Sequence, residues 1–114
     1  MVNPADLVVV VTTVDDPEKA NALAQGLVLS RLAACVTQVP QAVSTYWWQG
    51  AMETQAEVVL WLKTRRALLP AIEAYFQEHH PYTVPECVAL PMLGVSAAYG
   101  QWVWDQTQET VDSL

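Results

Sequence analysis

The sequence predicts an α+β fold in a single domain. Its 114 residues are the usual size of one domain, and residues 1–114 contain no repeat or linker that divides them. Runs of β-branched and aromatic residues alternate with stretches in which apolar residues recur at helical spacing. Two extended runs are separated only by Gln49 and Gly50, which predicts an antiparallel hairpin.

The first predicted elements are a strand and a helix. Residues 7–14, LVVVVTTV, are typical of a buried strand. Asp16 can cap the helix that follows, and Pro17 suits its first position because no backbone N–H bond is needed there. Glu18 places a negative charge at the positive end of the helix dipole. We expect this helix to end near Arg31.

The two extended runs of the hairpin are unusually long, at residues 33–48 and 51–64. A strand of about 15 residues spans about 50 Å, whereas a domain of this size has a diameter of about 35 Å. The hairpin must therefore bend or project beyond the domain. Pro40 cannot donate a backbone hydrogen bond, so it marks a bulge or the edge of a sheet. The predicted tip carries three aromatic residues: Tyr46, Trp47 and Trp48.

A second helix is predicted over residues 66–79, and Pro81 stops it because a residue before proline disfavours the helical conformation. Residues 86–92 are predicted to form a fourth strand, and Ser96 caps a last helix. The order βαββαβ with a C-terminal helix is that of the ferredoxin-like fold. Two helices cover one face of such a sheet, so the other face needs a different cover.

Composition limits the partners of this chain. Only 15% of the residues are charged and five are tryptophan, which indicates that part of the surface is hidden by further copies of the chain. A net charge of −7 with five Lys and Arg residues argues against nucleic acid. No apolar run is long enough for a membrane helix. Two cysteines, Cys35 and Cys87, are too few for a disulfide framework, so we expect a cytoplasmic protein.

Several motifs together resemble the CutA family of divalent-cation tolerance proteins over about residues 7–107: RLAACVTQVP, STYWWQG, HHPYTVPE and LPMLGVSAAYGQW. The resemblance implies a homotrimer of ferredoxin-like subunits, similar to PII signal transducers, whose hairpins reach across subunits. It also implies copper binding by a cysteine on the first strand together with His79 and His80. Thr12 stands at that cysteine position, and a hydroxyl is a poor ligand for Cu(I).

The two histidines allow a structural and a functional interpretation. His79 falls on the apolar stripe of the second predicted helix, with Leu69, Ile72 and Phe76, so we expect it to be packed and hydrogen-bonded. His80 leads into the proline turn, and we expect it to face a cleft, where a neutral imidazole could bind a metal ion or a ligand oxygen. Helical neighbours point about 100° apart, so the pair needs a further ligand to hold one ion.

Four polar residues are expected beside His80: Glu57, Lys63, Tyr82 and Glu86. They form either a satisfied ion pair with ordinary packing or a polar cleft that binds a small ligand. The resemblance implies that this cleft lies between subunits. Tyr46, Trp47 and Trp48 are expected to be anchors of the trimer interface.

The chain has no Gly-rich phosphate loop, nucleophile motif or HExxH spacing. We therefore expect that the protein is not an enzyme. No cofactor is required, although copper or another divalent cation could bind. The resemblance favours a divalent-cation tolerance protein that binds metal ions weakly in the intersubunit cleft. The residues alone favour a PII-like sensor of a small non-metal ligand. A structural assembly partner is the remaining alternative.

Overall fold

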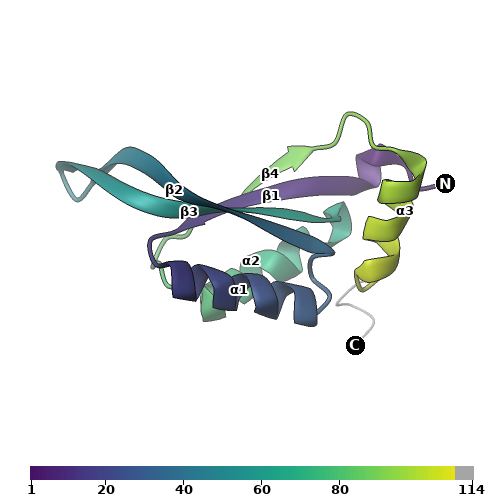
Figure 1. Cartoon of the computed structure of the whole chain (residues 1–114), viewed down its shortest axis with the longest axis horizontal. Coiled ribbons are helices and arrows are strands. Elements are labelled where there is room, and N and C mark those ends of the chain that lie inside the picture. Colours follow the sequence, from purple (N-terminus) through teal and green to yellow (C-terminus); the bar gives the residue numbers. More distant parts are fainter. Residues whose placement is uncertain (110–114) are drawn as a thin grey trace.

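The computed structural model describes residues 1–109 as one four-stranded sheet with two helices packed on the same face and a third at one end (Figure 1). The strands and helices, in chain order, are β1 (Leu7–Val14), α1 (Pro17–Leu29), β2 (Cys35–Trp48), β3 (Ala51–Arg65), α2 (Leu69–His79), β4 (Val88–Pro91) and α3 (Ala97–Gln106). Short 3₁₀ turns precede β1 and α2, at Pro4–Asp6 and Arg66–Leu68.

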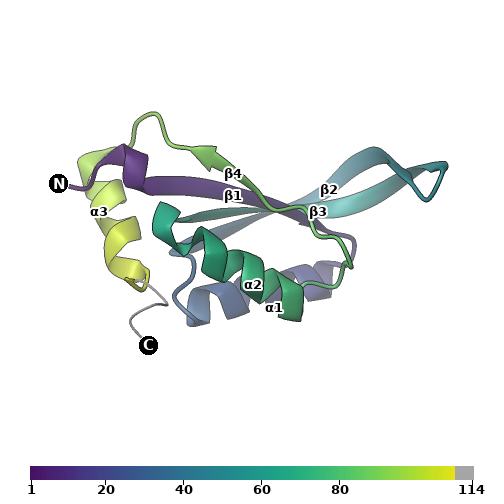
Figure 2. The same ribbon diagram turned by 180° about the vertical axis from the view of Figure 1, so that it is seen from behind.

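The strand order is β2-β3-β1-β4, and every neighbouring pair is antiparallel. This order and the helices α1 and α2 on one face are those of the ferredoxin-like fold (Figure 2). The predicted fold class, with its long central hairpin and C-terminal helix, is therefore confirmed.

Element boundaries follow the predicted signals closely, with two differences. The Asp16 side chain accepts hydrogen bonds from the N–H groups of Glu18 and Lys19, as a helix cap should. Helix α1 ends at Leu29 rather than near Arg31, because Arg31 adopts a left-handed conformation (φ 63°) that terminates the helix. Strand β4 has four residues where seven were expected, since only Val88–Pro91 pair with β1.

The core lies between the sheet and helices α1 and α2. Alternate side chains of β1 and β3 point into it, as the two-residue period of a strand requires. Phe76 of α2 is the largest fully buried side chain. The other core residues come from both strands and both helices, among them Val10, Val14, Leu60, Leu62, Leu23, Leu27 and Ile72.

The β2–β3 hairpin extends past the rest of the sheet, and the molecule measures 47 × 30 × 24 Å (Figure 1). Strand β1 pairs with β3 only as far as the Val14–Val58 pair, so the hairpin residues beyond it have no third strand beside them. The register shifts between Val39 and Ala42, which confirms the irregularity predicted at Pro40. Gln49 and Gly50 both have positive φ (50° and 81°), as a two-residue hairpin turn requires.

The face of the sheet opposite α1 and α2 carries apolar side chains that the described part of the chain leaves exposed. Val59 is half-buried, and Trp61, Val88 and Leu90 are exposed. These residues lie on the same side of the sheet because Val88 and Leu90 pair with β1 residues that face away from the core. The sequence-based expectation that this face lacks a cover within one chain is met.

Helix α3 is fixed to the end of β3 by Arg65. The Arg65 side chain is buried, and its Nε donates to Thr107 Oγ1 at 2.9 Å. Its Nη2 donates to the Trp104 carbonyl oxygen at 2.7 Å, and its guanidinium lies 3.7 Å from the centroid of the Trp104 ring. None of the helices within residues 1–109 is both long enough and apolar enough to cross a membrane.

Candidate functional site

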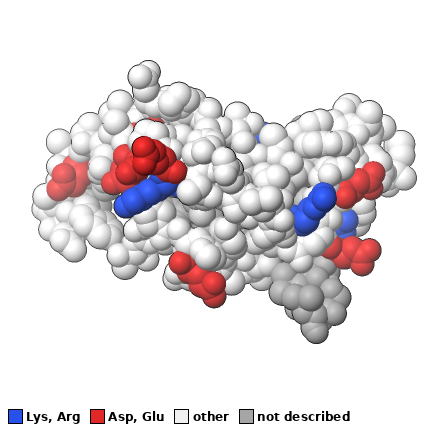
Figure 3. Space-filling model, turned by 60° about the horizontal axis from the view of Figure 1, so that its bottom comes forward, with Lys and Arg blue, Asp and Glu red and all other residues white. Residues whose placement is uncertain are grey.

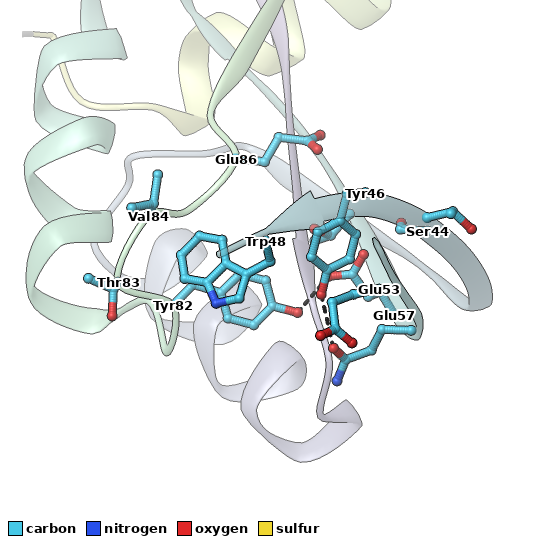
Figure 4. Close-up of a pocket in the computed structure, with 12 residues that line it drawn as sticks. Ser44, Tyr46, Trp48, Glu53, Glu57, Tyr82, Thr83, Val84 and Glu86 are labelled. Carbon is cyan, nitrogen blue, oxygen red and sulfur yellow. Dashed lines mark hydrogen bonds between the residues drawn. The ribbon is translucent and has the colours of Figure 1, made fainter. Parts of the chain in front are cut away.

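A cavity of about 680 Å³ lies between the hairpin and the segment that follows α2 (Figure 4). Strands β2 and β3 supply one wall, and residues 82–86 supply the opposite wall. The lining residues are Thr13, Ser44, Thr45, Tyr46, Trp48, Glu53, Gln55, Glu57, Tyr82, Thr83, Val84 and Glu86. The cavity thus contains three of the five residues expected in the ligand cleft: Glu57, Tyr82 and Glu86.

A short hydrogen bond joins the two walls of the cavity. Tyr82 Oη donates to Glu57 Oε2 at 2.5 Å, and Glu57 is only 6% exposed although it is an acid. Burial, together with the hydrogen bond to Glu57, raises the pKa of Tyr82 far above its usual value, so the phenol stays protonated and acts as a donor. Desolvation, and then the charge of Glu57, also raises the pKa of Glu86.

Further hydrogen bonds fix the hairpin side of the cavity. Tyr46 Oη donates to Gln55 Oε1 at 3.1 Å, and Gln55 Nε2 donates to Asp15 Oδ2 at 3.1 Å. Asp15 belongs to the turn between β1 and α1, so this chain of bonds connects the projecting hairpin to the body of the domain. The cavity wall is therefore held in place from two directions.

His80 lies beside this cavity without lining it. The imidazole is buried, with Nδ1 accepting from the Tyr82 backbone N–H at 3.1 Å and Nε2 3.0 Å from Thr12 Oγ1. An Nδ1 that accepts leaves the proton of the neutral ring on Nε2, which then donates to Thr12. The Phe76 ring meets His80 edge-on at 5.4 Å between centroids. His80 therefore positions Tyr82, and both of its ring nitrogens are engaged.

The expected orientation of the two histidines is reversed. His79 is exposed, stacks on Tyr75 with ring centroids 4.2 Å apart, and lies 3.7 Å from a Glu78 carboxylate oxygen. His80 is the packed one, because the buried stripe of α2 advances by four residues from Ile72 to Phe76 and reaches His80 directly after the end of the helix. The sequence analysis placed His79 on the buried stripe because it lies three residues after Phe76, which is also a helical spacing.

Lys63 does not join the cavity within one chain. Its Nζ donates to Thr37 Oγ1 at 2.6 Å, and the residue pairs with Val9 and Cys35 across the sheet. Glu57 and Lys63 share a face of β3, but six residues of strand separate them by about 20 Å. Lys63 therefore lies outside this cavity, although it was expected in the ligand cleft.

Glu53, Gln55, Ser44 and Thr13 are cavity residues that the sequence analysis did not identify. The sequence did carry a signal for Glu53 and Gln55. The two-residue turn at Gln49 and Gly50 fixes which residues of β2 and β3 pair along the hairpin tip. That register places Tyr46 opposite Glu53. The approach of residues 82–86 to the hairpin is a tertiary contact with no such local signal.

The donor atoms of one chain do not form a ready copper site. No group of three or more His, Cys, Asp or Glu side chains within residues 1–109 is placed to hold a metal ion. Thr12 does lie against His80, so the structure brings together two of the positions to which the resemblance assigns copper. A hydroxyl stands where the resemblance implies a thiolate, and His79 points elsewhere. Copper binding therefore stays a prediction.

We predict that His80 makes folding stability depend on pH. Burial lowers the pKa of His80, so the unfolded chain binds a proton more readily than the folded one. The free energy of unfolding should therefore fall as the pH drops below about 6.5, by at most about 1.4 kcal/mol per pH unit for each chain. Urea unfolding between pH 7.5 and 5.5 measures this, comparing His80→Gln with the exposed-site control His79→Gln. A slope that is lost in His79→Gln and kept in His80→Gln would contradict the assignment.

The fold and the site define a ferredoxin-like domain with a projecting hairpin and an acidic, aromatic cavity beside it. Residues 8–106 match the family model described as CutA1 divalent ion tolerance protein. The chain therefore belongs to the CutA1 family, as the sequence motifs predicted.

Individual relatives agree with this assignment. The chain is 41% identical over 103 residues to "Protein CutA 1, chloroplastic" of Oryza sativa, covering 90% of this chain and 58% of that protein. It is 41% identical over 99 residues to "Divalent-cation tolerance protein CutA" of Thermus thermophilus, covering 87% and 96%. The crystal structure of CutA1 from Oryza sativa superimposes with a TM-score of 0.89 at 40% identity, covering 93% and 97%. The chain thus spans about three fifths of the rice relative but nearly all of the bacterial one.

Proposed function

We propose that this chain acts in the cytoplasm as a homotrimeric divalent-cation tolerance protein that binds metal ions weakly in a cleft between subunits. Relatives in Thermus thermophilus and Pectobacterium atrosepticum are named for divalent-cation tolerance rather than for a reaction, which supports a role other than catalysis. The observation that carries the proposal is the cavity itself. Carboxylates of Glu53, Glu57 and Glu86 line it, and its lining residues include no lysine or arginine.

Two features of the surface support the homotrimer. The hairpin projects beyond the domain and exposes Val43, Trp47 and Met52, at 68%, 76% and 67%. The open face of the sheet adds Trp61, Val88 and Leu90. On the side of the molecule that Figure 3 shows, which is the side of α1 and α2, acidic and basic side chains form several separate groups. Exposed apolar surface of this kind is typical of a chain that is buried against copies of itself.

Weak metal binding is consistent with the donors available. Carboxylate oxygens suit hard divalent cations, and a neutral imidazole suits Cu(II) or zinc. A single chain provides no group of three ligands among its described residues, so each ion needs donors from a second subunit or from water. His80 can coordinate only after giving up one of its two hydrogen bonds, which costs part of the binding energy.

Calorimetric titration with Cu(II) tests this proposal. We expect weak binding at pH 7.5 that decreases below about pH 6.5, because imidazole must be neutral to coordinate a metal ion. Three variants test the donors separately. His79→Ala removes the exposed imidazole, His80→Ala removes the buried imidazole, and Glu57→Gln removes a carboxylate charge. Because Thr12 replaces a thiolate, we expect no preference for Cu(I). Equal binding by the wild type and all three variants at pH 7.5 and 5.5 would contradict the metal site.

A second candidate function is favoured by the size and lining of the cavity. A volume of about 680 Å³ is that of a site for a small organic molecule. Tyr46, Trp48 and Tyr82 contribute aromatic surface that a metal ion does not use. A trimer that senses a small non-metal ligand, in the manner of PII proteins, accounts for these residues better than metal binding alone.

A further inference from the structure

The cavity combines aromatic rings with carboxylates. Figure 4 shows Tyr46 and Trp48 reaching into it from the hairpin and Tyr82 reaching into it from the segment after α2. Glu53, Glu57 and Glu86 supply the carboxylates, and no lining residue is basic. The potential inside the cavity is therefore negative, and the aromatic faces add to it, because the face of an aromatic ring is its electron-rich side.

Glu57 is the least exposed of these acids and retains an oxygen for a ligand. Its Oε2 accepts the Tyr82 hydroxyl, whereas Oε1 accepts no hydrogen bond from the described residues. Every fully buried side-chain oxygen or nitrogen in the described part of the chain has a partner, so Oε1 must still reach the solvent of the cavity. Glu57 is 6% exposed and has no cation within ion-pairing distance among residues 1–109.

The dimensions favour an organic cation over a bare metal ion. A divalent metal ion needs several oxygen ligands at about 2.0–2.6 Å, and the described residues offer no group of three that is close enough. An alkylammonium ion instead needs one carboxylate for its charge and aromatic faces within about 6 Å for its methyl or methylene groups. The carboxylate and the rings are both present, in a cavity large enough for such a molecule.

We propose that this cavity binds a small organic cation, with its ammonium group at Glu57 Oε1 and its alkyl groups against Tyr46 and Trp48. The inference rests on the second candidate function, in which the cavity takes a small non-metal ligand. It adds the chemical class of that ligand, a quaternary or primary ammonium ion with no negative charge of its own. Glu53 and Glu86 contribute long-range attraction.

The test compares two probes of the same shape that differ in charge. Choline carries a trimethylammonium group, and 3,3-dimethyl-1-butanol replaces its nitrogen with carbon. Calorimetry and the tryptophan fluorescence of the assembled protein should both detect choline. We expect the neutral alcohol to bind at least about tenfold more weakly, since it loses the ion pair and the cation–π attraction.

Three variants locate the site. Glu57→Gln keeps an acceptor for Tyr82 but removes the charge, and Trp48→Leu removes the ring, so each should weaken choline binding about tenfold. Glu73→Gln is the matched control, because Glu73 is an exposed acid of α2 outside the cavity. It should bind choline as the wild type does. Lys63→Met tests whether a neighbouring copy places its lysine in the cavity, and it should bind choline as the wild type does if no lysine enters.

Each contrary result has a defined meaning. If both probes bind equally, the cavity takes a small ligand but recognises apolar shape, and the cationic class is wrong. If choline binds only to Lys63→Met, the lysine of a neighbouring subunit occupies the cavity and the inference is overturned. If neither probe binds while Cu(II) does, the metal proposal stands and the inference fails. Weakening by Glu73→Gln equal to that by Glu57→Gln places the site elsewhere and also overturns it.

Discussion

Replacing Phe76 with alanine is expected to lower the free energy of unfolding by about 3–5 kcal/mol. The Phe76 ring is fully buried between α2 and the sheet, so its loss leaves a cavity that the surrounding strands cannot close. Since the stability of a whole domain is typically about 5–15 kcal/mol, this one change removes a large part of it.

The loss of Phe76 should also reach the candidate site. Its ring packs edge-on against His80, and His80 accepts from the Tyr82 backbone N–H. Tyr82 in turn donates to Glu57 across the cavity. Urea unfolding at several protein concentrations measures the stability, and Gln77→Ala is the control because Gln77 is exposed on the same helix. A loss below about 1 kcal/mol would show that the site collapses around the missing ring.

Replacing Trp47 with alanine is expected to weaken self-association about thirtyfold or more, which corresponds to about 2 kcal/mol. Trp47 pairs with Met52 at the tip of the hairpin, and both side chains are exposed within one chain. Trp47 does not line the cavity, whereas Trp48 does, so a change at Trp47 separates assembly from ligand binding.

Sedimentation equilibrium measures this effect. The wild type should be a trimer at micromolar concentration, and Trp47→Ala should populate smaller species. Leu29→Ala is the matched control, because Leu29 is 82% exposed but lies at the end of α1 and not in the hairpin. A folded wild-type monomer at micromolar concentration would end the trimer proposal. If Trp47→Ala remains a trimer, Trp47 at the hairpin tip is not an anchor of the interface.

The sequence predicted the fold because its signals are local and agree with one another. Asp16 and Pro17 mark the start of α1, and Gln49 and Gly50 have backbone requirements that only a tight turn meets. Pro40 cannot pair as an ordinary strand residue, and the register does shift there. Each of these signals acts within a few residues, so no knowledge of the tertiary structure was needed.

The candidate site was harder to predict because tertiary contacts assemble it. Glu57 and Tyr82 are 25 positions apart and meet only because the segment after α2 returns along the hairpin. The sequence analysis expected His79 to be buried and His80 to face a cleft. Helical periodicity allows a step of either three or four residues after Phe76, and the structure buries His80. Lys63 and Glu57 point to the same face of β3. The two-residue period of a strand predicts that shared face, but it does not bring two side chains six residues apart into one site.

The bulge at Pro40 has a consequence for a chain that stands alone. Strand β2 is outermost in the sheet, so one side of its backbone has unpaired donors and acceptors, which can recruit the backbone of another chain into a growing aggregate. Pro40 offers no donor, and the shift between Val39 and Ala42 breaks the row into two shorter pieces. The longer uninterrupted piece, Ala42–Trp48, lies at the projecting tip and includes the highly exposed Trp47. Mispairing of a lone chain should therefore begin at the tip, and in the proposed trimer the contacts at the tip would also protect the chain from aggregation.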